Sequence, residues 1–216
     1  AGRVTVPSPP RPLRPLHALL PEGSVLYRVH RTSHGGIDDP GNRFNPGIGG
    51  PTRWAFFGRP IVPVLYAAAS PEAAVFETLL HDAVPGSVVP AAYYRSTVLT
   101  VLHTVRDLPL GQFHSAGLRK LGLHAADLTD TAAETYPATI EWAQAIHTDT
   151  DLAGIEWMSR QYNSVACLVL FEGPGRASAR DLVPAPDDPA GRNFALPHDQ
   201  EWLAALAARA DITIEV

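Results

Sequence analysis

The chain has 216 residues, of which 45% are hydrophobic and 18% charged, with a formal net charge of −5 at pH 7. This length fits one domain with a sizeable core, and the negative charge argues against nucleic acid as a direct partner, since phosphate binding needs a basic surface. A single cysteine excludes an intrachain disulfide, and no stretch approaches the roughly 18 apolar residues of a membrane span. We therefore expect a cytoplasmic protein that is independent of membranes.

Residues 1–22 are rich in proline, with VPSPPRPLRPL at their centre. Proline fixes φ and lacks a backbone donor, so this stretch cannot form a regular helix or a central strand. We expect an extended arm over the body or a mobile tail, followed by one domain over residues 23–216.

The first strand is expected at residues 24–30, where SVLYRVH is rich in β-forming side chains. The long loop that follows, over residues 31–54, is of the kind that binds a ligand or is disordered. A buried strand at residues 61–67 then leads into a helix within residues 65–82, for which Ser70 is a good N-cap and Pro71 suits the first helical position.

The rest of the chain predicts mostly short elements. We expect strands at residues 96–105, 154–157, 164–171 and 212–216, helices at 138–147 and 200–210, and irregular structure over 107–133. Strands outnumber long helices and the strand–helix alternation is poor, which favours an α+β fold over a doubly wound one.

Several chemistries have no motif in this sequence. It has no P-loop, no dinucleotide-binding glycine motif after a strand, no nucleophile elbow and no H-E-x-x-H, and its nine histidines are scattered. We therefore expect no metal. Cys167 lies in the apolar run VACLVLF, which favours a buried free thiol in a strand over a nucleophile.

Four polar features lie in or beside apolar surroundings: Arg28 within a strand, Arg43 in the loop sequence NRFNPG, Glu77 beside the apolar face of a helix, and Ser159 after a short strand. Each also has a plain alternative, as a solvated arginine, a surface loop residue, a solvated or capping glutamate, or a turn serine. Aromatic residues that could provide stacking surfaces accompany them, namely Tyr27, Phe44, Tyr66 and Trp157.

Together these residue types match the chemistry of a dinucleotide such as NAD. Arginine forks fit phosphate oxygens bidentately. A glutamate can hold a ribose hydroxyl and stabilise an oxocarbenium-like sugar, as carboxylates do in glycoside cleavage. The residues therefore indicate an NAD pocket without a Rossmann motif.

The order YRV, RFN, PVLYAAASPEAAVFETLLHD, GIEWMSR and VACLVLF resembles the RES domain family over about residues 24–172. The family is named for an arginine, a glutamate and a serine, which correspond here to Arg28, Glu77 and Ser159. Arg43 lies where the family has a second arginine, although Arg53 is a rival for that position.

The resemblance implies an ADP-ribosyltransferase-like fold, with a mixed β core and flanking helices in a single domain, and cleavage of the nicotinamide–ribose bond of NAD. Arg28 and Arg43 would bind the phosphates, Tyr27 would lie near the nicotinamide or ribose, Glu77 would act on that ribose, and Ser159 would position it. Family members are typically toxins of toxin–antitoxin pairs, neutralised by a small Xre-like antitoxin protein that blocks the cleft.

Several alternatives stay open at this point. The bond could be cleaved by hydrolysis or by phosphorolysis, for which Arg160 or Arg53 could supply a further cation, or the ADP-ribose could be transferred to a protein. A non-catalytic nucleotide-binding module and an interaction protein that uses the proline-rich arm are the other readings. A homo-oligomer is also possible.

Overall fold

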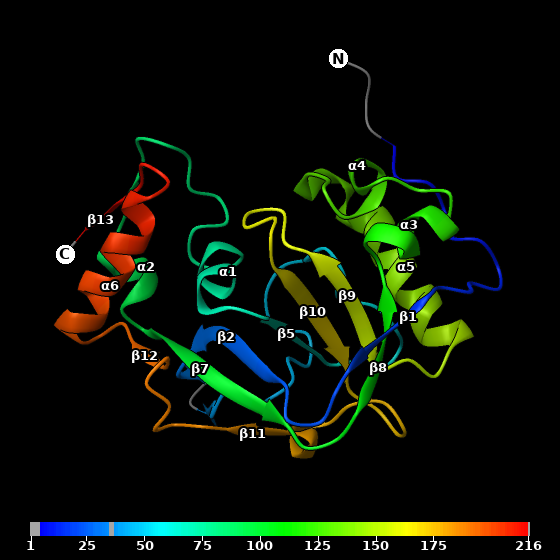
Figure 1. Cartoon of the computed structure of the whole chain (residues 1–216), viewed down its shortest axis with the longest axis horizontal. Coiled ribbons are helices and arrows are strands. Elements are labelled where there is room, and N and C mark those ends of the chain that lie inside the picture. The colour runs from blue at the N-terminus through cyan, green and yellow to red at the C-terminus, as the bar shows by residue number, and fades with distance from the viewer. Residues whose placement is uncertain (1–4, 35–36, 216) are drawn as a thin grey trace.

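The computed structural model describes residues 5–34 and 37–215 and is built around one large mixed sheet (Figure 1). The strands follow the order β1-β8-β9-β10-β5-β2-β7-β11, and β12 also pairs with β7. Only β8 and β9 run parallel among the described strands of this sheet. In spatial order the strands are β1 (His17–Leu20), β8 (Leu108–Gln112), β9 (Gly154–Met158), β10 (Ala166–Phe171), β5 (Val64–Ala68), β2 (Val25–Arg31), β7 (Thr97–Thr104), β11 (Leu182–Pro184) and β12 (Arg192–Asn193).

Helices gather at the two ends of this sheet, with α3, α4 and α5 beside β8 and β9, and α2 and α6 near β7 and β12 (Figure 1). The α-helices are α1 (Pro71–Phe76), α2 (Ala91–Tyr94), α3 (Ser115–Lys120), α4 (Ala125–Leu128), α5 (Tyr136–Asp149) and α6 (Pro197–Ala208). The 3-10 helices are η1 (Ala133–Thr135) and η2 (Ala179–Asp181), and two small sheets pair β6 (Val88–Val89) with β13 (Thr213–Ile214) and β3 (Ser33–His34) with β4 (Ile37–Asp38). The predicted single α+β domain with a mixed sheet and flanking helices is confirmed.

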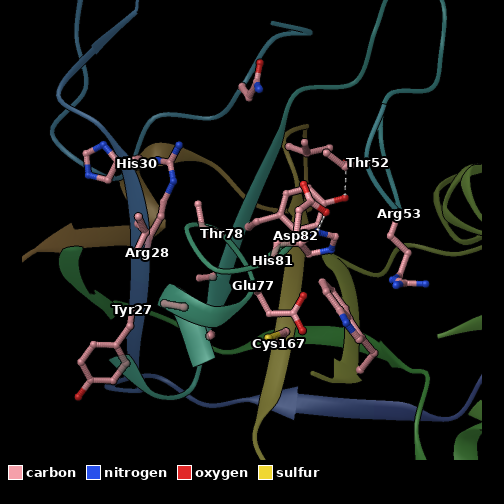
Figure 2. A pocket seen from close by; sticks show the side chains of 18 of the residues that line it. Tyr27, Arg28, His30, Thr52, Arg53, Glu77, Thr78, His81, Asp82 and Cys167 are labelled. Carbon is pink, nitrogen blue, oxygen red and sulfur yellow. Dashed lines mark hydrogen bonds and ion pairs between the residues drawn. The ribbon is translucent and has the colours of Figure 1, made fainter. Parts of the chain in front are cut away.

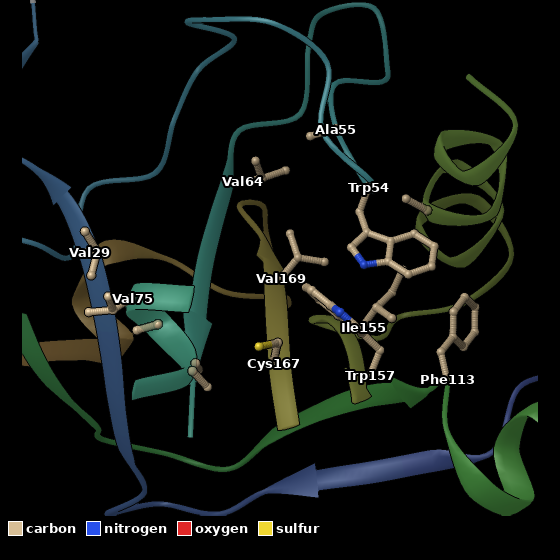
Figure 3. Close-up of a cluster of buried hydrophobic side chains, with 14 of the residues drawn as sticks. Val29, Trp54, Ala55, Val64, Val75, Phe113, Ile155, Trp157, Cys167 and Val169 are labelled. Atoms are coloured by element: carbon tan, nitrogen blue, oxygen red, sulfur yellow. The ribbon is translucent and has the colours of Figure 1, made fainter. Parts of the chain in front are cut away.

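Alternation along the central strands separates two cores. On β5, Val64 and Ala68 belong to one hydrophobic cluster, whereas Leu65 and Ala67 belong to the other. The strand β10 divides in the same way, because successive side chains of a strand point to opposite faces. Figure 3 shows the first cluster, which includes Cys167 and the buried indole rings of Trp54 and Trp157. This face carries the candidate site.

The proline-rich segment lies extended over the body from residue 5 onward. Leu13 is 1% exposed, its backbone N–H donates to Asp149 Oδ2 at 2.7 Å, and Trp142 Nε1 donates to the carbonyl of Pro7 at 2.7 Å. The segment then forms the edge strand β1, antiparallel to β8. Prolines are compatible with this path because the arm contributes an edge strand and no interior one.

The helix α1 is shorter than the stretch in which the sequence places it. It ends at Phe76 with Glu77 as its C-cap, and the backbone N–H groups of Leu79 and Leu80 both reach back to the carbonyl of Val75. This turn buries Leu79 and Leu80 together. None of the helices in the described part of the chain has the length and apolar character needed to cross a membrane.

Candidate active site

A cavity of about 580 Å³ opens over the first face of the sheet (Figure 2). Its walls come from β2, β5 and β10, from α1 and the turn after it, from the loop around residues 45–53, and from the start of α5. Ligand pockets commonly have volumes of about 300–1,000 Å³, so the space suits a nucleotide-sized molecule. Of the predicted site residues, Tyr27, Arg28, Tyr66 and Glu77 line this cavity.

Glu77 lines this cavity and contacts Ser159, which does not line it, although 82 positions separate the two residues in the chain. Ser70 accepts the N–H of Ala73 at 3.1 Å and starts α1, so the short helix delivers its C-cap residue Glu77 to the cavity wall. The hydroxyl of Ser159, which follows β9 and is 1% exposed, donates to Glu77 Oε1 at 2.5 Å. Gln161 donates its backbone N–H to the same oxygen at 3.1 Å.

The two carboxylate oxygens of Glu77 differ in their contacts. Oε2 has no hydrogen-bond partner within residues 5–34 and 37–215, while Oε1 accepts two donors. Ser159 Oγ is itself held by the backbone N–H of Tyr162 at 2.7 Å. The carboxylate is therefore held in place through one oxygen and can receive a ligand on the other.

Apolar and aromatic groups surround this carboxylate. The ring of Tyr66 packs edge-on against Trp157, with centroids 6.0 Å apart, and its hydroxyl contacts Thr52 Oγ1 at 2.8 Å and the backbone N–H of Trp54 at 3.0 Å. Burial raises the pKa of the Tyr66 hydroxyl, although these two hydrogen bonds oppose the shift. Burial also raises the pKa of the Cys167 thiol, and the charge of Glu77 adds to this. Cys167 is a buried free thiol in the strand β10, as predicted. It also lines the cavity.

Arg28 lines the cavity but is largely occupied by the neighbouring loop. Its Nη1 donates to the carbonyls of Gly41 at 2.6 Å and Arg43 at 2.9 Å, and its Nη2 lies 3.3 Å from Asp39 Oδ2. Burial lowers the pKa of Arg28, and Asp39 opposes that shift. A guanidinium has five N–H donors, so Nε and one hydrogen of Nη2 have no partner among residues 5–34 and 37–215.

Arg43 and Arg53, the two candidates for the second phosphate-binding arginine, differ in their position relative to the cavity. The side chain of Arg43 is not among the groups that line the cavity, whereas Arg53 is. Arg53 donates to Thr131 Oγ1 at 2.8 Å and Thr131 O at 3.0 Å, and its guanidinium lies 5.5 Å from the centroid of the Tyr136 ring. Burial lowers the pKa of Arg53, and the charge of Glu77 is among the effects that oppose this.

Tyr27 lines the cavity, but Figure 2 shows its ring pointing away from Glu77. Trp157 is 4% exposed and its Nε1 has no hydrogen-bond partner in the described part of the protein. The predicted roles of Tyr27 at the nicotinamide and of Trp157 as a stacking surface stay predictions.

Several cavity residues were not identified from the sequence. Asp39 fixes Arg28, and His30, Arg31, His81, Asp82 and Tyr136 line the cavity. His81 and Asp82 fall within the stretch that carries the family resemblance, so a signal was present for them. No sequence motif pointed to Tyr136, because this residue is the first of α5, outside the motifs that carry the resemblance. Among the described residues, no group of three or more His, Cys, Asp and Glu side chains could hold a metal ion.

Comparisons with known proteins give one family match and one structural match. A family model described as the RES domain matches residues 25–199. One chain of the M. tuberculosis MbcT–MbcA toxin–antitoxin complex aligns with a TM-score of 0.49 and 16% identity, over 77% of this chain and 86% of that chain. No curated protein sequence matches the chain. The matched span includes Arg28, Glu77 and Ser159.

Proposed function

The chain belongs to the RES domain family, and from this premise we propose that it is a toxin enzyme that consumes NAD by cleaving the nicotinamide–ribose bond. The observation that carries the proposal is the Glu77 carboxylate. One of its oxygens is fixed by Ser159 and Gln161, and the other has no partner among the described residues, at the wall of a cavity of about 580 Å³. The resemblance to NAD-cleaving family members supplies the substrate.

The proposed chemistry requires a group that stabilises positive charge on the ribose. When the bond to nicotinamide breaks, its electron pair stays on the pyridine nitrogen and the ribose becomes oxocarbenium-like. A carboxylate already held in position stabilises that charge without reorganisation during the reaction. In this proposal the free oxygen of Glu77 faces the ribose, and Ser159 acts by orienting the carboxylate.

The arginines support the binding of a pyrophosphate. Arg28 keeps donors on Nε and Nη2, and Arg53 adds a second cation on the cavity wall. Planar guanidinium groups suit phosphate oxygens. Tyr66 and Trp157, whose rings pack edge-on, add an apolar wall to this cavity.

The test is the release of nicotinamide from NAD by the purified protein, measured by chromatography with and without phosphate. Glu77→Gln removes the charge that stabilises the ribose cation and is expected to lower the rate by at least about a hundredfold, the scale of a lost transition-state contact. Glu72→Gln is the matched control, since Glu72 lies on the same helix and does not line the cavity. It is expected to act like the wild-type protein.

Other outcomes distinguish the alternatives. Label from NAD that remains on a macromolecule in a cell extract indicates ADP-ribosyl transfer to a protein. A rise in melting temperature with NAD, but no nicotinamide release under any condition, indicates a non-catalytic binding module and contradicts the proposed enzyme.

We also propose, from the family alone, that a small antitoxin with an Xre-like DNA-binding domain neutralises the protein by covering the cavity. Expression of the wild-type chain alone should then stop bacterial growth, while Glu77→Gln and coexpression with the antitoxin should each restore it. Equal growth arrest by the wild-type and Glu77→Gln proteins would separate toxicity from NAD cleavage.

A further inference from the structure

His81 and Asp82 form a polar pair on the cavity wall, and neither residue has a role in the proposed stabilisation of the ribose cation. His81 Nδ1 lies 2.8 Å from Asp82 Oδ1, and the two side chains are 26% and 89% exposed. A carboxylate beside Nδ1 favours the tautomer with its hydrogen on Nδ1, which leaves the lone pair on Nε2. In the described part of the chain, Nε2 has no hydrogen-bond partner.

Gln161 forms hydrogen bonds with both His81 and the proposed catalytic carboxylate of Glu77. Its backbone N–H donates to Glu77 Oε1 at 3.1 Å, and its side-chain amide donates to the carbonyl of His81 at 2.9 Å. One residue thus holds both the Glu77 carboxylate and the His81 backbone. Glu77, His81 and Asp82 all line the cavity and are labelled in Figure 2.

We propose that His81, oriented by Asp82, is the general base that activates water in the cleavage of NAD. This inference rests on the proposed function. The bond between C1′ and nicotinamide breaks, its electron pair goes to the pyridine nitrogen, and neutral nicotinamide leaves. A water oxygen bonds to C1′ while Nε2 takes one proton from that water and later passes it to solvent. The products are nicotinamide, ADP-ribose and one proton.

The geometry divides two tasks between two residues. Glu77 would lose its charge by accepting a proton, and with it the stabilisation of the ribose cation. Its Oε1 is already occupied by Ser159 and Gln161. His81 is partly exposed and therefore in contact with the solvent that supplies water and removes protons. Imidazole is also the side chain most often used as a general base.

The test uses an acceptor that needs no base. In buffer without phosphate, His81→Asn is expected to lower NAD hydrolysis about a hundredfold, the low end of what general bases contribute. Sodium azide is already an anion, so it should restore nicotinamide release and yield an ADP-ribosyl azide that mass spectrometry identifies. Asp82→Ala, at a largely exposed side chain, should show a smaller loss with the same rescue.

His198→Asn is the matched control. His198 also lies beside a neighbouring aspartate, with Nε2 at 3.4 Å from Asp199 Oδ2, but its side chain is 73% exposed and outside the cavity. It is expected to leave hydrolysis unchanged.

Three results would overturn the assignment of His81 and leave NAD cleavage intact. These are wild-type hydrolysis by His81→Asn, a loss that azide does not restore, and a wild-type protein that releases nicotinamide only with phosphate or azide. A wild-type protein that releases no nicotinamide with any acceptor overturns the proposed function itself.

Discussion

Arg28 has a structural task in addition to the proposed binding of phosphate. It binds the loop of residues 39–43 through two carbonyl oxygens and the buried carboxylate of Asp39, whose side chain is 3% exposed. Asp39 also receives the N–H of Gly41 at 2.8 Å. An arginine in a strand can therefore be half-buried without a ligand. Replacing it tests the stability of the fold as well as binding.

Arg28→Ala is expected to lower the free energy of unfolding by about 3 kcal/mol, because it removes the guanidinium from the buried Asp39 carboxylate. The double variant Arg28→Ala/Asp39→Ala also removes the buried carboxylate and should lose less. Urea denaturation measures both. An equal or larger loss of unfolding free energy in the double variant would show that Arg28 does not stabilise the buried Asp39 carboxylate. Glu77 is therefore the cleaner position for testing catalysis.

At the level of elements, α1 shows how a short helix positions a functional group. The helix spans six residues, too few to be stable alone. It is supported by the Ser70 cap, by Pro71 at the first position, and by the burial of Ala73, Ala74 and Val75. Its C-cap is Glu77, so any change in where the helix starts or ends moves the carboxylate.

Ser70→Ala is expected to cost about 1 kcal/mol of stability, because the N–H of Ala73 loses its side-chain acceptor. Ser70→Asp keeps an acceptor and should stay close to the wild-type protein. Urea denaturation gives the stability change. We also expect Ser70→Ala to lower the rate of nicotinamide release. If the free energy of unfolding of Ser70→Ala equals that of the wild-type protein, water replaces the Ser70 cap and the prediction is wrong.

At the scale of the whole molecule, Asp181 connects η2 to the turn between β7 and β8. Arg106 Nε donates to Asp181 Oδ1 at 2.7 Å, and Ser178 donates both its backbone N–H and its hydroxyl to Oδ2. Burial would raise the pKa of Asp181, but these hydrogen bonds and the charge of Arg106 together lower the pKa below its ordinary value of 3.8. The folded state therefore favours the charged carboxylate.

A lowered pKa in the folded state means that the Asp181 carboxylate stabilises the fold above its ordinary pKa of 3.8. This stabilisation is lost as the pH falls through the lower pKa of the folded state. Asp181→Asn should therefore be less stable than the wild-type protein at neutral pH, with a difference that shrinks below about pH 4. Urea denaturation at both pH values checks this. A difference independent of pH would contradict it.

Residue patterns along the chain are enough to predict the class of the fold, because short apolar strands, frequent turns and few long helices favour an α+β domain. They also place the cap of α1, since Ser70 and Pro71 act through local backbone geometry. The motif order singled out Arg28, Glu77 and Ser159 as a family pattern. All of these signals lie within a few neighbouring residues or in the order of motifs along the chain.

The identity of the groups that share the cavity depends on how the sheet and its loops are assembled. In the folded structure the Ser159 hydroxyl donates to Glu77. The Arg28 guanidinium donates to the carbonyls of Gly41 and Arg43. Arg53 lines the cavity, whereas the Arg43 side chain does not. These outcomes depend on strand order and on backbone carbonyls, which every residue carries. A backbone carbonyl acceptor is the same in every residue type. The partner of a buried arginine therefore cannot be predicted from the sequence and is known only from the folded structure.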